Sequence, residues 1–334
     1  MLFLGLQGSP RLKGNTQFLL SLFLREAEKQ GARSITVHVD KKNIQPCKEY
    51  IVCEKKGFCP IKDDMKHEIY PLLRKADVVV AASPVFFYNF TAQLKALIDR
   101  SQTLWARKYR LKLKDPGYKT RKGFLLSVGA TRGANLFEGL KLTASYFFDA
   151  IDAEFEGSLT YRDIEAAGDL EGHPTVRQDV KSAVTGLMKP WLNRKKILFV
   201  SRKNAALSQM AAAYTRYFFG DTYDAESAGI APADRIDKTM EAVMGERGID
   251  MAFRTPQTFA QAVEEGRPDR IIFLGPADMP LDLSNASLEH WKLSDPSGKS
   301  IDFMRELRDV IEKHVTEQIR SSNAKNTTNT EKED

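Results

Sequence analysis

The chain has 334 residues, of which 42% are hydrophobic and 28% are charged, with a formal net charge of +6. This composition is typical of soluble globular proteins, and the length favours two hydrophobic cores over one. No apolar run approaches the length of a membrane-spanning helix, and the apolar start MLFLGL is interrupted by Gly8-Ser9-Pro10, so it reads as a strand. We therefore expect a cytoplasmic protein with no membrane partner.

Strand and helix patterns alternate along the first part of the chain. The predicted strands cover residues 2–6, 34–39, 77–82, 123–128 and 153–157. The predicted helices cover residues 15–29, 63–75, 91–105, 135–150 and 174–188. Such repeated strand–helix units favour a parallel sheet that is covered by helices on both faces.

The same alternation restarts after MKPWLNRKK, residues 188–196. Further strands are predicted over 197–200, 223–227 and 270–274, and helices over 205–219, 235–247 and 300–320. The sequence thus predicts an α/β protein with two doubly wound parallel sheets, in domains 1–193 and 194–320. The polar segment 321–334 has almost no apolar residues, so we expect it to be disordered.

Positive charge is concentrated in the first part of the chain and peaks at residues 105–123. Such a segment suits either a nucleic acid or a solvated loop beside an anionic cofactor. The sequence shows no aromatic-studded sheet and no recognition-helix motif. We therefore expect no nucleic-acid partner.

The loop GLQGSPRLKGNTQFLL, which follows the first strand and opens the first helix, has the composition of a phosphate nest. Its glycines permit close approach of the backbone, and backbone amides at a helix N-terminus attract anions. Ser9, Arg11, Asn15 and Thr16 add polar and charged side chains. The spacing matches neither the P-loop nor the dinucleotide fingerprint, so the loop predicts a single phosphate.

Two further loops at strand ends suit a flat ring. One contains Pro84, Val85, Phe86 and Phe87, and the other runs from Ala130 through Thr131 and Arg132 to Gly133. Ligands of open α/β sheets bind at the carboxyl ends of the strands, where these loops are expected. One phosphate loop with two ring-holding loops is what a flavin mononucleotide requires.

Three motifs in order, GSPR–GNT, PC-x5-C-x5-CP-x-KDDM and SPVFF-x-NFTAQLKALIDR, resemble the NAD(P)H-dependent FMN reductase family. This flavodoxin-like group includes the iron–sulfur flavoproteins, and the resemblance covers about residues 1–190. It implies FMN bound non-covalently, NAD(P)H as co-substrate, and a quinone, free flavin or other small molecule as electron acceptor. It also implies a homodimer or homotetramer.

The same resemblance assigns the cofactor-binding residues. It places the FMN phosphate on Ser9, Arg11, Asn15 and Thr16, and the ring on residues 84–87. The loop Ala130, Thr131, Arg132, Gly133 borders that ring. Because a flavin carries the hydride chemistry itself, we expect no catalytic side chain.

The three cysteines Cys47, Cys53 and Cys59 lie within one short segment. An iron–sulfur cluster is usually held by four thiolates, and Tyr50 stands where the resembling sequences often carry another cysteine. We therefore expect no cluster and no other metal. The thiols would then be remnants of a site or would line the flavin pocket.

The second part of the chain resembles the low-molecular-weight protein tyrosine phosphatase fold, which thioredoxin-coupled arsenate reductases share. The resemblance rests on ILFVSRKNAALSQMAAAY, SAGIAP and WKLSDP and covers about residues 195–320. That family works through C-x5-R, in which a thiolate attacks and a guanidinium binds the oxyanion. Here Ser201 and Leu207 occupy the two positions.

We therefore expect this second domain to be a catalytically dead pseudophosphatase. Its candidate anion site comprises Ser201, Arg202, Lys203, Asn204, Ser208 and Asp295. The whole chain is then predicted to be an FMN-dependent NAD(P)H oxidoreductase with an inactive second domain. The alternative is a redox- or anion-sensing regulatory protein that binds FMN without rapid turnover.

Overall fold

The computed structural model describes residues 1–275 and 286–319. Within it the chain separates into two compact units. The first unit comprises Met1–Lys114 and Tyr118–Leu192, and the second comprises Asp115–Gly117 and the described chain from Asn193 onward. The predicted disordered segment 321–334 lies outside the described residues, as does the last residue of the helix predicted over 300–320.

The first unit is built on a five-stranded parallel sheet with the order β2-β1-β3-β4-β5. The strands are β1 (Leu2–Gln7), β2 (Arg33–His38), β3 (Val78–Pro84), β4 (Lys122–Val128) and β5 (Glu154–Tyr161). Most residues of β1, β3 and β4 are buried. This burial explains the continuous apolar runs that predicted a doubly covered sheet, and it confirms the α/β class.

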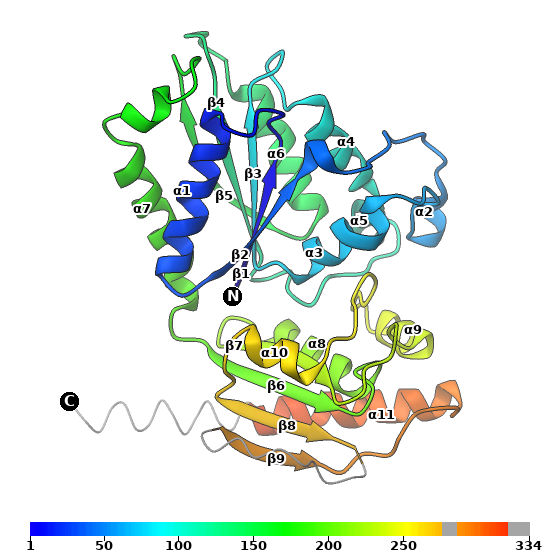
Figure 1. The fold of residues 1–334 in the computed structure, drawn as a ribbon. Coiled ribbons are helices and arrows are strands. Elements are labelled where there is room, and N and C mark those ends of the chain that lie inside the picture. Colours follow the sequence, from blue (N-terminus) through cyan, green and yellow to red (C-terminus); the bar gives the residue numbers. More distant parts are fainter. Residues whose placement is uncertain (276–285, 320–334) are drawn as a thin grey trace, which may run out of the picture. The chain divides into compact units, whose positions relative to one another are not determined.

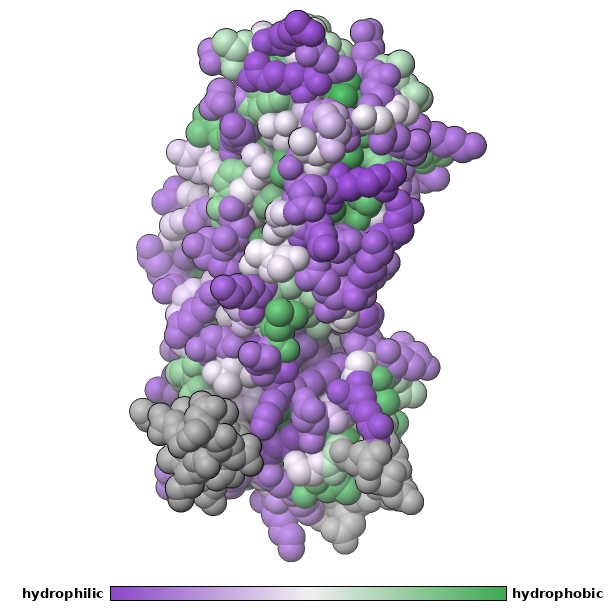
Figure 2. All heavy atoms as spheres, turned by 90° about the vertical axis from the view of Figure 1, so that its left-hand side faces the viewer, coloured by the Kyte–Doolittle hydropathy of each residue, from purple (hydrophilic) through white to green (hydrophobic). Residues whose placement is uncertain are grey.

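Helices cover both faces of this sheet (Figure 1). One face packs against α1 (Asn15–Lys29) and α7 (Val176–Met188), which also contact each other. The other face carries α3 (Tyr70–Lys75), α4 (Ala92–Arg100), α5 (Gln102–Tyr109) and α6 (Glu138–Ala150). Figure 2 shows a surface that is mostly hydrophilic on the side of α1 and α7, as expected for helices buried along one stripe.

Shorter elements complete the first unit. These are η1 (Val39–Lys41), α2 (Val52–Lys56), η2 (Met65–Ile69), η3 (Asp169–Gly172) and η4 (Lys189–Trp191).

Two elements of the first unit differ from the sequence prediction. The helix predicted over 91–105 is two helices, α4 and α5, which meet at Ser101. The last strand extends to Tyr161, beyond the predicted end at Gly157, because that glycine adopts a φ of 152° next to a register shift in the β4–β5 ladder. As a result, the loop at the carboxyl end of β5 begins at residue 162, and it contributes to the site described below.

The second unit has a four-stranded parallel sheet with the order β7-β6-β8-β9. Its strands are β6 (Lys195–Ser201), β7 (Tyr223–Gly229), β8 (Arg270–Leu274) and β9 (Ser287–Trp291). Three helices, α8 (Leu207–Phe219), α9 (Lys238–Glu246) and α11 (Ile301–His314), share one apolar core with the sheet, whereas α10 (Phe259–Glu264) packs on the other face (Figure 1). The turn η5 (Val315–Ile319) continues α11.

Neither β9 nor α10 was predicted from the sequence. The strand SLEHW is largely polar and α10 has only six residues, so neither carries a clear periodic signal. Within residues 1–275 and 286–319, every helix is too short or too polar to span a bilayer.

Candidate functional site

The carboxyl ends of the central strands of the first unit surround a cavity of about 400 Å³. Its walls come from the loops after β1, β3, β4 and β5, which the parallel topology brings to one edge of the sheet. The volume lies within the range typical of small-molecule sites. Eight of the twelve predicted cofactor residues line it, namely Ser9, Arg11, Asn15, Thr16, Pro84, Val85, Phe86 and Ala130.

One end of the cavity is suited to an anion. Helix α1 begins there after Gly14, with no side-chain cap and no acidic residue in its first turn, so its first amides remain available. Arg11 and Lys13 are exposed beside it. The Thr16 hydroxyl has no hydrogen-bond partner among the described residues, although Thr16 is 98% buried. This set of donors fits a phosphate group.

Asn15 has another function in the structure. Its amide nitrogen donates to the Ala166 carbonyl over 2.7 Å, and its oxygen accepts from the backbone of Gly168 and Leu170, each at 3.2 Å. The side chain therefore ties the loop after β5 to the start of α1. Only the backbone amide of Asn15 is left for a phosphate.

The loop before α1 is held close to the sheet through Gly8. Its amide donates to the Ala82 carbonyl over 2.8 Å, and its own carbonyl accepts from the Thr91 hydroxyl over 2.6 Å. A Cβ atom at Gly8 would lie 2.7 Å from Leu94 and 3.0 Å from the Ala82 carbonyl. Position 8 therefore requires glycine, because the backbone lies too close to Leu94 and Ala82 to leave room for a side chain.

The other end of the cavity is apolar. Pro84, Val85 and Phe86 line it. Residues 86–89 then form a tight turn, in which Phe86 and Asn89 exchange two backbone hydrogen bonds of 2.9 Å. The two central residues have φ values of 47° and 59°, which is unusual for aromatic residues.

Phe87, at the tip of that turn, is fully exposed and does not line the cavity. The turn packs closely against Gly139 of α6. A Cβ atom at Gly139 would lie only 2.1 Å from the Tyr88 carbonyl oxygen. The backbone conformation of the turn thus places Phe87 apart from the other three predicted ring-binding residues, Pro84, Val85 and Phe86.

The loop after β4 contributes less to the cavity wall than predicted. Ala130 lines the cavity, whereas Thr131, Arg132 and Gly133 do not. Arg132 instead donates to both carboxylate oxygens of Asp163, at 2.9 and 2.8 Å.

Several cavity residues were missed by sequence reasoning. Pro10, Lys13 and Gly14 belong to the predicted phosphate loop, and Val128 and Gly129 precede Ala130. Ile164, Glu165 and Ala167 come from the loop after β5. They were missed because the strand was predicted to end at Gly157, and a longer alternating pattern, EFEGSLTY, was the available signal.

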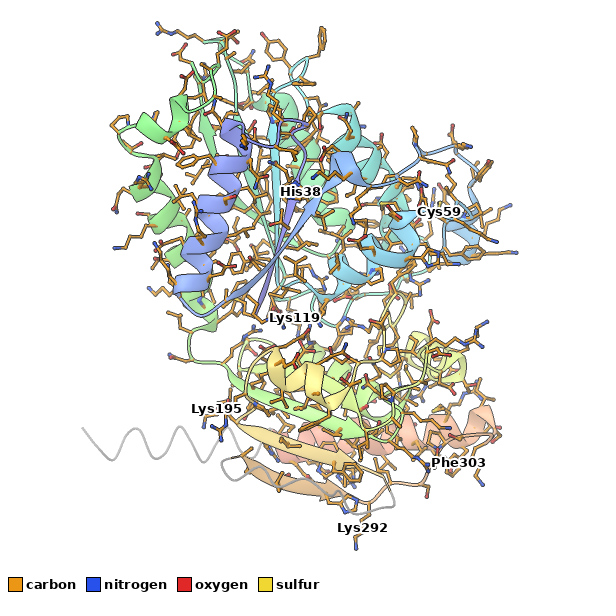
Figure 3. All side chains as sticks on the ribbon, viewed as in Figure 1. His38, Cys59, Lys119, Lys195, Lys292 and Phe303 are labelled. Carbon is orange, nitrogen blue, oxygen red and sulfur yellow. The ribbon has the colours of Figure 1, made fainter. Side chains whose placement is uncertain are left out.

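The three cysteines line a second cavity of about 400 Å³ beside α2. Cys59 lies on the segment next to that helix (Figure 3), and all three thiols are free. Burial raises the pKa of the Cys53 thiol. Among residues 1–275 and 286–319, no group of three or more His, Cys, Asp or Glu side chains is placed to hold a metal ion.

Two arginines hold the cysteine segment against the helices. Arg100, from α4, donates to Asp63 over 2.6 and 3.1 Å and to the Gln45 carbonyl over 2.8 Å. Arg107, from α5, donates to the Gly57 carbonyl over 3.0 Å. Hydrogen bonds therefore hold the cysteine segment near its two ends, at Gln45 and Asp63, and between them at Gly57.

Part of the basic segment of residues 105–123 is engaged within the first unit. Lys108 pairs with Asp149 at 2.8 Å, and Lys122 pairs with Glu154 at 2.7 Å. Arg121 is buried and donates to backbone carbonyls. Lys108, Arg121 and Lys122 therefore serve the scaffold.

The second unit contains its own cavity, of about 660 Å³, at the carboxyl ends of β6 and β8. It is lined by Ser201, Arg202, Lys203, Leu207 and Asp295, among others, while Asn204 and Ser208 are buried behind it. The carbonyls of Ser201, Arg202, Lys203 and Ala205 all accept hydrogen bonds from the segment 230–237. The amides of Ala205, Ala206 and Leu207 have no acceptor among the described residues.

The Ser201 hydroxyl is engaged in the scaffold of this loop. It lies 2.8 Å from the Ser208 hydroxyl and accepts from the Asn204 amide over 3.2 Å. Asn204 adopts a left-handed φ of 49° and donates to Ser208 over 2.9 Å. The backbone amide of Ser297 holds the pKa of Asp295 below its usual range, and Lys203 and Arg202 add to this effect.

The first unit is thus an α/β domain with a cavity at the carboxyl edge of its parallel sheet. The family of NADPH-dependent FMN reductases matches residues 1–151, and the family of low molecular weight phosphotyrosine protein phosphatases matches residues 196–278. The chain belongs to these two families, one in each unit, which confirms the predicted fusion.

Individual relatives agree with this division. An iron–sulfur flavoprotein of Methanosarcina thermophila is 39% identical over 128 residues, covering 38% of this chain and 63% of that protein. An iron–sulfur flavoprotein of Methanocaldococcus jannaschii is 33% identical over 144 residues, which cover 43% of this chain and 69% of that protein. Arsenate reductase 1 of Staphylococcus haemolyticus is 30% identical over 128 residues, which cover 38% of this chain and 96% of that protein. The chain spans less than two thirds of the Methanosarcina protein.

Proposed function

We propose that the chain is an FMN-dependent NAD(P)H oxidoreductase, with FMN bound in the cavity of the first unit. The observation that carries this proposal is a single cavity with free amides and basic side chains at one end and an apolar wall at the other. A mononucleotide with a flat ring requires this combination. The family of the first unit and the names of its relatives support the choice of flavin.

The residues of the chain would bind and orient the cofactor. The amides at the start of α1, with Arg11 and the Thr16 hydroxyl, would bind the phosphate. Val85 and Phe86 would exclude water from one side of the ring. When bound, FMN supplies the acceptance and release of hydride, so the protein contributes position and electrostatics.

NADH or NADPH would be the donor, and a quinone, free flavin or another small molecule the acceptor. A homodimer or homotetramer in the cytoplasm would be the working form. We also propose domains 1–193 and 194–320, and no iron–sulfur cluster, because only three thiols line the cysteine cavity.

One sample tests these statements together. The absorption spectrum of the purified full-length protein, with its FMN and iron content, should show about one FMN per chain and no iron. Bleaching under argon on addition of NADH or NADPH, followed by recovery with a quinone, would support the oxidoreductase. Stoichiometric FMN that no nicotinamide reduces would instead support the alternative of a redox sensor, and absence of FMN would refute both.

For the second unit we propose a catalytically inactive module that binds a tetrahedral anion. Leu207 has no hydrogen-bonding group, and the Ser201 hydroxyl is bonded within the loop. The unpaired amides of residues 205–207 favour retained anion binding over a purely structural role. Millimolar phosphate should raise the melting temperature of this unit, whereas release of phosphate from an aryl phosphate would refute inactivity.

A further inference from the structure

Two loops on the wall of the second cavity, residues 201–207 and 295–298, are joined by a chain of hydrogen bonds. Lys203 donates to the Ser297 hydroxyl over 3.0 Å, and the Ser297 amide donates to the Asp295 carboxylate over 2.9 Å. All three residues line the cavity. The Asp295 carboxylate is therefore attached to the loop on which we propose that an anion binds.

The 201–207 loop offers the cavity mainly hydrogen-bond donors. Ala206 and Leu207 line the cavity, are each only 6% exposed, and have backbone amides without an acceptor among the described residues. Arg202 and Lys203 add a guanidinium and an ammonium group, which can donate but cannot accept. An anion on this loop would thus be held by donors from the loop itself.

Three carboxylates line the same cavity in the part of the chain that the structure describes. Asp237 accepts from two backbone amides at the start of α9, at 2.7 and 3.0 Å, and so caps that helix. Asp234 precedes it on the segment 230–237. Asp295 differs from both, because its bonds lead back to Lys203 and because Arg202 and Lys203 act on it electrostatically.

The Asp295 carboxylate is ionised at neutral pH. The bond from the Ser297 amide is the main reason that its pKa lies below the usual range, and the two cations of the 201–207 loop add to this effect. An ionised carboxylate can only accept hydrogen bonds, at about four positions, so the bonds from Ser297 leave it able to accept more. A bound anion would thus meet donors on the loop and an acceptor beside it.

Tetrahedral anions differ in how they suit such an acceptor. Inorganic phosphate keeps a P–O–H group through the neutral range, and this group can donate to a carboxylate. Sulfate and the dianion of a phosphate monoester carry no proton, so each would place a bare oxygen against a bare carboxylate. A site built around a hydrogen bond rejects the analogue that lacks the hydrogen.

We propose that Asp295 is a specificity-determining residue, which makes the second cavity select free oxyanions that carry a hydroxyl group, such as inorganic phosphate, over sulfate and phosphate monoesters. This inference rests on the proposed function of the second unit as an anion-binding module. The ligand would then be a free inorganic anion and not a phosphorylated side chain.

The test is isothermal titration calorimetry of the full-length protein with inorganic phosphate, sulfate and methyl phosphate. Excess FMN is present, so that it competes for the first cavity, and the ionic strength is fixed. At about pH 8 all three anions are chiefly dianions, so they differ in the proton and not in net charge. The variant is Asp295→Asn, and the charge-matched control is Asp302→Asn, on α11, where Asp302 pairs with Arg305 at 2.6 Å and does not line the cavity.

The wild type should bind phosphate about tenfold more tightly than sulfate or methyl phosphate, at the weak end for a hydrogen bond to a charged group because Asp295 is exposed. In Asp295→Asn the ratio should fall to about one, because an amide can donate to a bare oxygen. Loss of a negative charge alone would strengthen all three anions equally, so only the ratio reports the hydrogen bond. Asp302→Asn should keep the wild-type ratio.

Equal affinity of the wild type for phosphate and sulfate would overturn the inference, as would an Asp295→Asn variant that retains the tenfold preference. If that variant does not fold, methyl phosphate decides with the wild type alone, since binding as tight as that of phosphate is equally contrary. A wild-type protein that binds none of the three anions would refute the proposed anion-binding module instead, so the two failures are distinguishable.

Discussion

Replacement of Asn15 by alanine is the sharpest test of how the cavity is held together. The change removes three hydrogen bonds that join α1 to residues 166–170. Each bond contributes about 0.5–1.5 kcal/mol, and the Leu170 amide is buried, so it would lose its partner without gaining water. We expect the free energy of local opening of this loop to fall by about 2 kcal/mol.

Hydrogen exchange followed by mass spectrometry measures this opening directly. The amides of Gly168 and Leu170 should exchange about 30-fold faster in Asn15→Ala, because 1.4 kcal/mol corresponds to a factor of ten. Peptides from the buried strand β3 should exchange as in the wild type. Unchanged exchange at residues 168 and 170 would refute the inferred role of Asn15.

The variant Asn15→Asp separates loop attachment from charge. A carboxylate still accepts from Gly168 and Leu170, so exchange there should remain near the wild-type rate. It loses the bond to Ala166 and places a negative charge at the start of α1, where the phosphate is proposed to bind. FMN affinity should therefore fall about tenfold or more in Asn15→Asp, even though the loop stays protected.

Three further predictions concern other parts of the molecule. Gly139→Ala should lower the free energy of unfolding of the first unit by about 1–3 kcal/mol, because the new Cβ atom would lie 2.1 Å from the Tyr88 carbonyl oxygen. Gly186→Ala, where a Cβ atom meets no neighbour, should instead stabilise α7 by up to about 1 kcal/mol. Urea denaturation measures both changes. Arg100→Met should lower the free energy of unfolding by about 3–5 kcal/mol, because it leaves the buried Asp63 carboxylate without its partner, and it should speed the reaction of the cysteines with a thiol reagent. Lys95→Met breaks an exposed ion pair and should change neither the stability nor the thiol reaction. Since the folded pKa of Asp295 lies below its unfolded value of about 3.9, its stabilisation is present at neutral pH and is lost as the pH falls through the folded pKa. The difference in melting temperature between wild type and Asp295→Asn should therefore shrink between pH 6 and pH 3, and a constant difference would contradict this assignment.

Much of the fold was predictable because the buried strands have strong local signals. Helix α1 was predicted with its observed ends because its apolar residues have a helical periodicity. Strand β8 was predicted with its observed ends because it is a short, continuous apolar run with a polar boundary. The phosphate loop was predictable for the same reason, because it is continuous in sequence. The break at Ser101 was not, because apolar spacing continues through it and only packing against different neighbours separates α4 from α5.

The roles of particular side chains were harder to predict than the loops that carry them. Asn15 reads as a phosphate ligand in the sequence, but its partners lie about 150 residues later in the chain. Phe87 reads as a ring-binding residue, but a left-handed backbone carries it to the tip of a turn. Such roles depend on where distant backbone groups lie, and local pattern carries no information about that.

The sequence by itself determined the class of each unit, most of its strands and long helices, and the replacement of cysteine and arginine by Ser201 and Leu207. These follow from hydrophobic periodicity and from residue identity, which are local properties. Only the tertiary structure decided which loops meet at the cavity, that the β5 loop forms one wall, and that the Asn15 side chain bonds to backbone rather than to a ligand. Parallel topology brings together strand ends that are far apart in sequence, so these contacts exist only once the sheet has formed.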